Sequence, residues 1–246
     1  MSIKETEAIV IKSYNLSEAD RIVVFFTREY GVIRGVAKGA KRLQSRFGSM
    51  LEPFSTVTVS FFQKEERELV TLREIELIES RFARTSEPAF LEAFSYIGEL
   101  LTDFAPPHDA DEKLYRMITA CLSAAQDEAG LGAVRLYFEL WLLRLSGFLP
   151  QWEICNSCSR PLGPDESARL ISGFHLSCSN CRAGYAISEV TADDRRFYAD
   201  VLRMSPVDFV VSAAGRREQF RVISDVLSRL IAQALGREVA GSAALS

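Results

Sequence analysis

The pattern of hydrophobic and polar positions divides the chain at about residue 80. Before this point, short runs rich in β-branched and aromatic residues alternate with glycine-containing turns, a pattern typical of β-strands. After it, apolar residues recur every three or four positions, which is typical of amphipathic helices. The sequence therefore predicts an α+β multidomain chain in which strands come first and helices follow.

Five short strands are expected in the first domain, with a basic, glycine-containing connector between the third and the fourth. This number of strands fits a small closed barrel of the oligonucleotide/oligosaccharide-binding (OB) type. An SH3-like barrel also has room for five strands, so strand number alone leaves both open. The expected strands are residues 6–14, 21–27, 32–37, 54–62 and 69–78.

Aromatic residues in this domain come in adjacent pairs, Phe25-Phe26 and Phe61-Phe62. Because successive side chains of a strand point to opposite faces, one ring of each pair is expected in the barrel core and the other outside. We expect the outer rings to pack against the helical domain rather than to stack on bases.

Helical periodicity begins near Phe90 and continues to Phe104, where Pro106-Pro107 is expected to end the segment. Four further helices are expected at about residues 114–122, 133–146, 191–204 and 216–236, the last two separated by Pro206. The expected divisions are an OB-fold nucleic-acid-binding domain (1–80), a helical domain in two parts (81–149 and 187–238), a cysteine-containing module (150–186) and a flexible tail (239–246).

Four of the five cysteines form two Cys-x-x-Cys pairs, Cys155 with Cys158 and Cys178 with Cys181. This spacing is typical of a structural zinc site, in which four thiolates surround one ion and leave no position open for water or substrate. A pair of disulfides is the alternative. The chain starts without a secretory apolar run, and a cytosolic chain keeps its thiols reduced, so we predict structural Zn²⁺. The fifth cysteine, Cys121, lies among apolar residues at helical spacing and is expected to be buried and inert.

Composition and net charge describe an ordinary globular chain, with 48% hydrophobic residues, 25% charged residues and a net charge of −4. No apolar stretch is long enough to cross a bilayer, so no membrane partner is expected. The charges are unevenly distributed: residues 87–139 hold ten acids against three bases. A chain with one basic and one acidic region can attract a polyanion at one surface and repel it at another.

Between Glu29 and Glu52 the chain has no acidic residue at all. Glycines in this segment let the backbone approach phosphates, and Phe47 is an aromatic that can stack on a base or lie in the core. The segment can also be a solvated charged loop, but the absence of compensating acids favours sequence-tolerant, salt-dependent binding of nucleic acid. The candidate binding residues are Arg34, Lys38, Lys41, Arg42 and Arg46. Arginines at 216, 217, 221 and 229 are a secondary candidate for phosphate contact.

Evidence for catalysis is weak. Walker and dinucleotide-binding glycine patterns are absent. The two histidines, His108 and His175, have no recognisable nucleophile beside them, and neither has a glutamate two positions on, as a zinc deaminase requires. We therefore expect a non-enzymatic protein with no catalytic residues.

Two blocks of sequence resemble the RecO family of bacterial recombination mediators. The first block comprises residues 7–12 (EAIVIK), 17–23 (SEADRIV), 27–42 (TREYGVIRGVAKGAKR), 45–47 (SRF) and 51–54 (LEPF). The second is residues 138–150 (FELWLLRLSGFLP), running into Cys155. The resemblance covers most of the chain and is weak after Ala186.

The resemblance implies an N-terminal OB barrel, a helical domain and a zinc-binding insert. It also implies binding of single- and double-stranded DNA, annealing of complementary strands and assistance in loading RecA onto strands coated by single-strand-binding protein. Expected partners are RecR and single-strand-binding protein, with RecA as an indirect one, in the cytoplasm at the nucleoid. The family's basic barrel region matches the five basic residues named above.

Two alternatives to this mediator stay open. One is a zinc-containing RNA-binding or scaffold protein without annealing activity. The other is a zinc-dependent nucleic-acid enzyme, which four cysteine ligands disfavour because they fill the coordination sphere.

Overall fold

The computed structural model describes residues 3–63, 68–105, 108–181 and 185–239. The chain divides into two compact units, residues 1–122 and 123–246, and each is described by itself.

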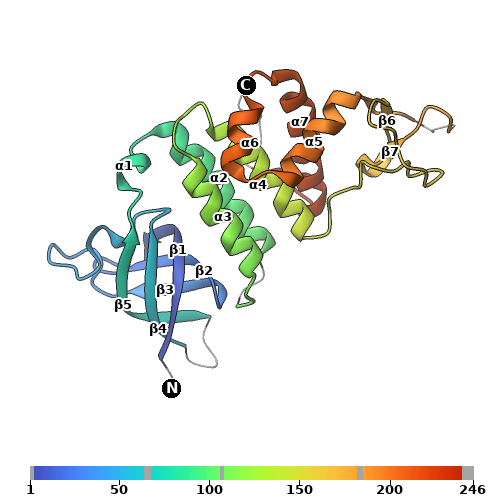
Figure 1. Ribbon diagram of the computed structural model, residues 1–246. Coiled ribbons are helices and arrows are strands. Elements are labelled where there is room, and N and C mark those ends of the chain that lie inside the picture. Colours follow the sequence, from blue (N-terminus) through green and yellow to red (C-terminus); the bar gives the residue numbers. More distant parts are fainter. Residues whose placement is uncertain (1–2, 64–67, 106–107, 182–184, 240–246) are drawn as a thin grey trace. The chain divides into compact units, whose positions relative to one another are not determined.

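The first unit contains a closed barrel with strand order β1-β2-β3-β5-β4 (Figure 1). Neighbouring strands are antiparallel except for β3 and β5, which pair in parallel although β4 lies between them in sequence. This crossover distinguishes the OB type from a barrel of consecutive antiparallel neighbours, so the predicted five-stranded OB-type barrel is confirmed. The strands are β1 (Ile3–Asn15), β2 (Arg21–Thr27), β3 (Gly31–Ala37), β4 (Thr56–Phe62) and β5 (Leu69–Glu79).

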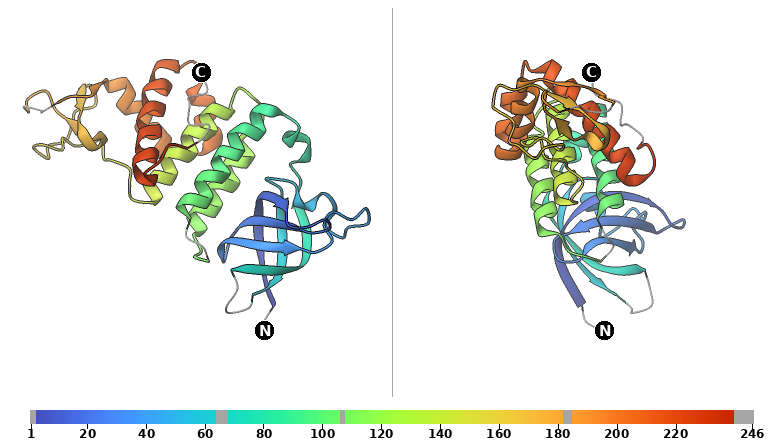
Figure 2. Two further views of the ribbon diagram at one scale, coloured as in Figure 1. Left: turned by 180° about the vertical axis from the view of Figure 1, so that it is seen from behind. Right: turned by 90° about the vertical axis from the view of Figure 1, so that its right-hand side faces the viewer.

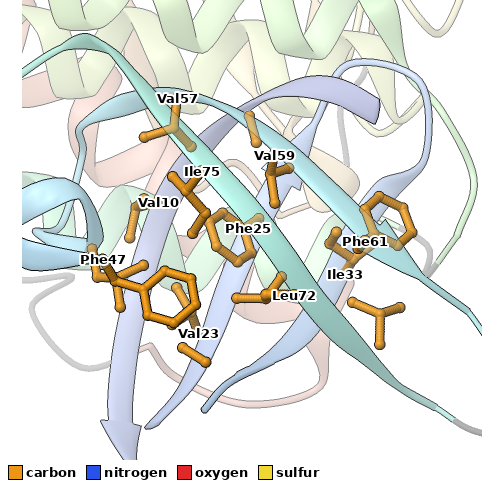
Figure 3. Packing of buried hydrophobic residues seen from close by; sticks show 14 residues of the cluster. Val10, Val23, Phe25, Ile33, Phe47, Val57, Val59, Phe61, Leu72 and Ile75 are labelled. Carbon is orange, nitrogen blue, oxygen red and sulfur yellow. The ribbon is translucent and has the colours of Figure 1, made fainter. Parts of the chain in front are cut away.

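The barrel core is built from the inward-facing side chains of all five strands (Figure 3). Of the aromatic pairs, Phe25 and Phe61 lie in this core, as the alternation predicts. Phe26 points outward, is fully buried and packs on Tyr115, with ring centroids 6.0 Å apart. Phe62 also points outward but stays partly exposed, with the Arg73 guanidinium 5.9 Å from its ring centroid. Phe26 therefore packs against a helix, as predicted for the outer rings.

The outer face of β1 and β2 is covered by helices of the same unit, α2 (Pro88–Phe104) and α3 (Glu112–Ala124). Phe54 packs on Phe94 of α2 with ring centroids 5.4 Å apart. Gly98 of α2 lies so close to β1 that a Cβ there would come within 2.9 Å of Ile11 Cγ2. Strand β2 and the middle of β1 (residues 8–11) are therefore buried on both faces, and β2 is closed to ligands from outside.

A short helix links the barrel to α2. Helix α1 (Phe82–Thr85) precedes α2, which begins with Pro88 in its first turn. Proline is tolerated there because the first helical N–H groups have no partner within the helix. The predicted stop at Pro106-Pro107 lies outside the described residues, and α2 ends at Phe104.

The second unit contains four helices among its described residues: α4 (Leu131–Leu145), α5 (Ala192–Arg203), α6 (Pro206–Ala213) and α7 (Arg217–Leu235). The sequence predicted α4, α5 and α7. It treated Pro206 only as a break between α5 and α7, and this was wrong because Pro206 begins α6. Ser205 caps α6 by accepting a hydrogen bond from the Asp208 N–H at 3.2 Å, so Pro206 starts a helix instead of interrupting one. Of the expected tail, Val239 is buried and residues 240–246 lie outside the described part.

A small antiparallel sheet lies between α4 and α5 in sequence. Its strands β6 (Ala168–Leu170), β7 (Leu176–Ser177) and β8 (Ser188–Val190) are ordered β7-β6-β8. This agrees with the short strands and turns expected for the cysteine module. Within the described parts of the chain, no helix has the length and apolar content to span a bilayer.

Replacing Phe54 should test the contact between barrel and helices. Phe54→Ala removes a ring that is 1% exposed and leaves a cavity against α2, so we expect a loss of about 3–5 kcal/mol in unfolding free energy. Hydrogen exchange measured by mass spectrometry should show faster exchange in β1 and α2. The control, Phe82→Ala, truncates a ring that is 61% exposed and should leave exchange nearly unchanged. Equal effects of both variants would contradict this packing.

Candidate nucleic-acid interface and metal centre

The basic connector, defined here as residues 38–51, extends from the barrel between β3 and β4 (Figures 1 and 2). Its first half is fixed to the loop that joins β1 and β2. Gly39 N–H donates to Asp20 Oδ1 at 2.8 Å, and Lys41 N–H donates to the Ala19 carbonyl at 3.0 Å. Gly39 has φ +74°, a conformation that favours glycine and turns the chain at this point.

The second half of the connector is fixed by burial. Phe47 is 1% exposed and lies with Leu51 in the barrel core, as Figure 3 shows for Phe47 beside Val23. A 3-10 turn at Gly48–Leu51 follows, and Met50 packs against the same core. The sequence allowed two roles for Phe47, base stacking and core packing. The structure places it in the core, where it is the largest side chain that the connector contributes.

Four of the five candidate cations lie on this connector and are exposed: Lys38, Lys41, Arg42 and Arg46. Lys41 Nζ donates to the Ser17 carbonyl at 3.3 Å, and Arg46 Nη2 lies 3.5 Å from the Leu72 carbonyl. Within the described residues, none of the four has a carboxylate oxygen within 4.0 Å. Their positive charge is therefore not neutralised by an ion pair in that part of the chain.

Arg34 differs from the other four. It lies on β3 and pairs with Glu68 at 2.8 Å, with both side chains largely exposed. An exposed pair of this kind contributes little stability, so Glu68 can be displaced by a phosphate. Arg46 lies along the Phe47 ring, 4.8 Å from its centroid, which fixes the side chain next to β5. Arg34 and Arg46 thus lie next to β5, whereas Lys41 contacts the loop between β1 and β2.

The arginines of α7 are arranged differently. Arg221 pairs with Glu218 at 2.8 Å, Arg229 pairs with Asp225 at 3.1 Å, and Arg216 pairs with Asp200 of α5 at 2.8 Å. Glu218 holds the pKa of Arg221 above its usual value through a hydrogen bond and its charge. These ion pairs make the helix a weaker candidate for phosphate contact than the connector.

The four cysteines of the two pairs come together in the second unit, with all sulfur atoms within 4.8 Å of one another. Sγ–Sγ separations are 3.9 Å between Cys155 and Cys181, 3.9 Å between Cys158 and Cys178, and 3.6 Å between Cys178 and Cys181. A tetrahedral site with metal–sulfur bonds of about 2.3 Å has edges of about 3.8 Å. The cluster therefore fits one tetrahedral metal ion.

Disulfides, the alternative, are not formed: all four thiols are free, and their sulfurs are far beyond the roughly 2.05 Å of a bond. Burial acts to raise the pKa of Cys155, but N–H groups of Cys178, Cys158 and Ser157 donate to its sulfur and lower that pKa to about 5. A thiolate is thus favoured at Cys155, as a metal ligand requires, whereas hydrogen bonds with Cys178 and Cys158 raise the pKa of Cys181 to about 12. Cys121 is the opposite case, since burial alone raises its pKa and no metal-ligating group joins it among the described residues. His175 is not a member of the cluster.

Side chains that the sequence did not single out hold the cysteine cluster in place. Arg169 of β6 donates to the Cys178 carbonyl at 2.9 Å and to the Cys181 carbonyl. These contacts fix the second Cys-x-x-Cys pair. Arg195 of α5 donates to the carbonyls of Gly163 at 2.7 Å and Glu166 at 2.8 Å. Only the tertiary structure identifies them, because an arginine that binds carbonyls has no local sequence signature.

Stacking of two aromatic rings anchors the module to α5. Trp152 lies on Tyr198 with ring centroids 4.4 Å apart, and both are nearly fully buried. Each also satisfies its polar atom: Trp152 Nε1 donates to the Phe174 carbonyl at 3.0 Å, and the Tyr198 hydroxyl donates to the Pro150 carbonyl at 2.7 Å. The module therefore has a small core of its own beside the metal site.

Comparison with known proteins agrees with this architecture. Residues 1–81 match the family model "Recombination protein O N terminal" and residues 91–242 match "Recombination protein O C terminal". The DNA repair protein RecO of Koribacter versatilis is 31% identical over 243 residues, which covers 96% of each chain. Two further proteins of the same name are 34% identical: that of Syntrophotalea carbinolica over 73% of this chain and 69% of its own, and that of Rubrobacter xylanophilus over 74% and 73%. This chain belongs to the recombination protein O (RecO) family of DNA repair proteins.

Proposed function

We propose that this protein is a recombination mediator in DNA repair that works by binding DNA and not by catalysis. In this proposal it binds single- and double-stranded DNA, anneals complementary strands and assists the loading of RecA onto DNA coated by single-strand-binding protein. RecR and single-strand-binding protein are the proposed partners, and the cytoplasm at the nucleoid is the proposed location. The division into a barrel, a split helical domain and a cysteine module is proposed to separate these tasks.

One observation carries the proposal: the connector presents four exposed cations without a carboxylate partner in the described part of the chain. Phosphates neutralised by such side chains release condensed counterions, which supplies most of the sequence-independent affinity for DNA. The connector is fixed at both ends, by Asp20 and by Phe47, so its charges are held in position before the ligand arrives. An ordered site loses less conformational entropy on binding than a free loop.

Strand annealing follows from the same electrostatics. Two DNA strands repel each other through their phosphates, and a positive surface that contacts both lowers this repulsion. No covalent step is needed. The four-cysteine arrangement is consistent with such a role, because four sulfur ligands leave no open coordination position for a catalytic water.

We further propose that the metal is zinc and that it is structural. Tetrahedral sites of four thiolates select Zn²⁺ or iron–sulfur centres, and the single-ion spacing of the cluster favours Zn²⁺. The strands of the cysteine module have only two or three residues each, and its buried apolar side chains are few compared with the barrel core, so metal–thiolate bonds supply stability that burial alone does not. The ligands are Cys155, Cys158, Cys178 and Cys181.

Reversing the charge of Lys38, Lys41 and Arg42 together should weaken DNA binding. With each changed to Glu, we expect at least a roughly tenfold loss of affinity for a single-stranded oligonucleotide in fluorescence anisotropy. The slope of log K against log salt should fall by about 2, because each lost phosphate contact accounts for about 0.7 on a single strand.

The matched control reverses three arginines of α7, Arg217, Arg221 and Arg229. Two of them are already ion-paired, so affinity should change far less than in the connector variant. Equal losses in the two variants would indicate a nonspecific effect of net charge. Unchanged affinity of the connector variant at low salt would exclude the connector from DNA binding.

Annealing should be measured directly with complementary fluorescent strands, with and without single-strand-binding protein, over a range of salt concentrations. We expect the wild-type protein to accelerate annealing and to lose this activity as salt rises, since screening removes the electrostatic attraction. Competition with RNA of the same sequence separates the alternatives. Preferential RNA binding without annealing would instead identify an RNA-binding or scaffold protein.

Loss of the metal should affect the second unit only. Elemental analysis is expected to give one zinc per chain, and Cys158→Ser should lose it because three sulfurs no longer close the tetrahedron. The control Cys121→Ala should keep its zinc. Hydrogen exchange after chelation should increase in β6 to β8 while the barrel strands stay protected; barrel exchange that rises equally would contradict a locally structural metal.

A further inference from the structure

We propose that Leu43 is an apolar wedge that inserts between neighbouring bases of the nucleic acid bound by the connector. The inference rests on the proposed function and adds to it a specific contact with bases, where the cations contact only phosphates. It concerns a residue that the sequence did not distinguish from its neighbours.

Leu43 is the most exposed large hydrophobic residue in the part of the chain that the structure describes, at 107% relative accessibility. Single exposed hydrophobic residues are common on protein surfaces, so exposure alone is no argument. Its surroundings are the distinguishing feature. Lys41 and Arg42 precede it, Arg46 follows it, and the acid-free interval extends well to either side.

The backbone presents Leu43 at the corner of a turn. Ser45 N–H donates to the Arg42 carbonyl at 3.0 Å, which closes a four-residue turn with Leu43 and Gln44 as its central residues. Arg42 N–H in turn donates to the Gly39 carbonyl at 3.1 Å, which joins this turn to the one held by Asp20. The side chain is therefore held outward before any ligand binds.

Phe47 is buried and cannot stack on a base, which leaves Leu43 as the candidate for contact with bases. The Phe47 ring lies in the barrel core, so the connector has no aromatic residue with which to stack on a base. Leu43 is the one large apolar side chain that the connector leaves exposed among its described residues, since Leu51 is buried and Met50 packs on the core.

Wedge residues such as leucine enter between base steps from a positively charged surface and partly unstack them. Here Arg42 and Arg46 flank Leu43 and can bind the phosphates on either side of the separated step. A protein surface as the occupant would have to accept an apolar residue surrounded by cations. A polyanion with apolar base faces meets both requirements, and we therefore assign the wedge to nucleic acid.

The test uses the full-length protein and single-stranded and duplex oligonucleotides that carry 2-aminopurine, whose fluorescence rises when its stacking is disrupted. Wild-type protein should raise the fluorescence at least about twofold at saturation. Leu43→Ser should abolish this rise and weaken binding roughly three- to tenfold, with an unchanged salt dependence because no charge is lost. Leu43→Met keeps the apolar bulk and should retain the rise.

The matched control is Leu77→Ser, which alters a leucine of β5 that is 41% exposed and lies between Glu76 and Glu79. It should behave as wild type. If the wild-type protein fails to bind DNA at low salt, the proposed function fails and the wedge with it. If it binds, and Leu43→Ser raises 2-aminopurine fluorescence as wild type does, only the wedge is overturned and DNA binding by the cations stands.

Discussion

Burial of Phe47 in the barrel core is the interaction on which the candidate DNA-binding surface depends. A connector with several cations and no acids repels itself, and alone it would sample many conformations. With Phe47 and Leu51 in the core at one end and Gly39 bound to Asp20 at the other, the segment between them is reduced to short hydrogen-bonded turns. The barrel core therefore stabilises the fold and also positions the charges.

Helix packing decides which side of the barrel is available. In OB barrels the face of the second and third strands commonly contacts the ligand. Here the outer side of β2 is covered, since Phe26 packs on Tyr115 of α3 and Val24 is 1% exposed. The outer side of β5 is largely exposed, and Arg34 and Arg46 lie next to it. Packing and electrostatics thus indicate the same surface.

The cysteine module has too little secondary structure to be stable by itself. Its strands have two or three residues each, too short to hold a sheet together by themselves. The four sulfurs, the Trp152–Tyr198 stack and the carbonyl contacts of Arg169 and Arg195 replace a large core. Arg195 and Tyr198 are both on α5, so their contacts with the module attach it to that helix.

Local patterns in the sequence were sufficient to predict the five strands, most of the helices and the cysteine cluster, while the choice of an OB-type over an SH3-like barrel came from the family resemblance. Strand alternation, helical periodicity and the Cys-x-x-Cys spacing are short-range signals, and the resemblance to RecO rested on such blocks. Tertiary structure alone decided the rest. It placed Phe47 inside and Leu43 outside, paired Arg34 with Glu68 but left Lys38 without an acid among the described residues, and made Pro206 the start of a helix. Burial and ion pairing depend on residues distant in the chain, and so the side of a loop that faces water cannot be read from the loop's own sequence.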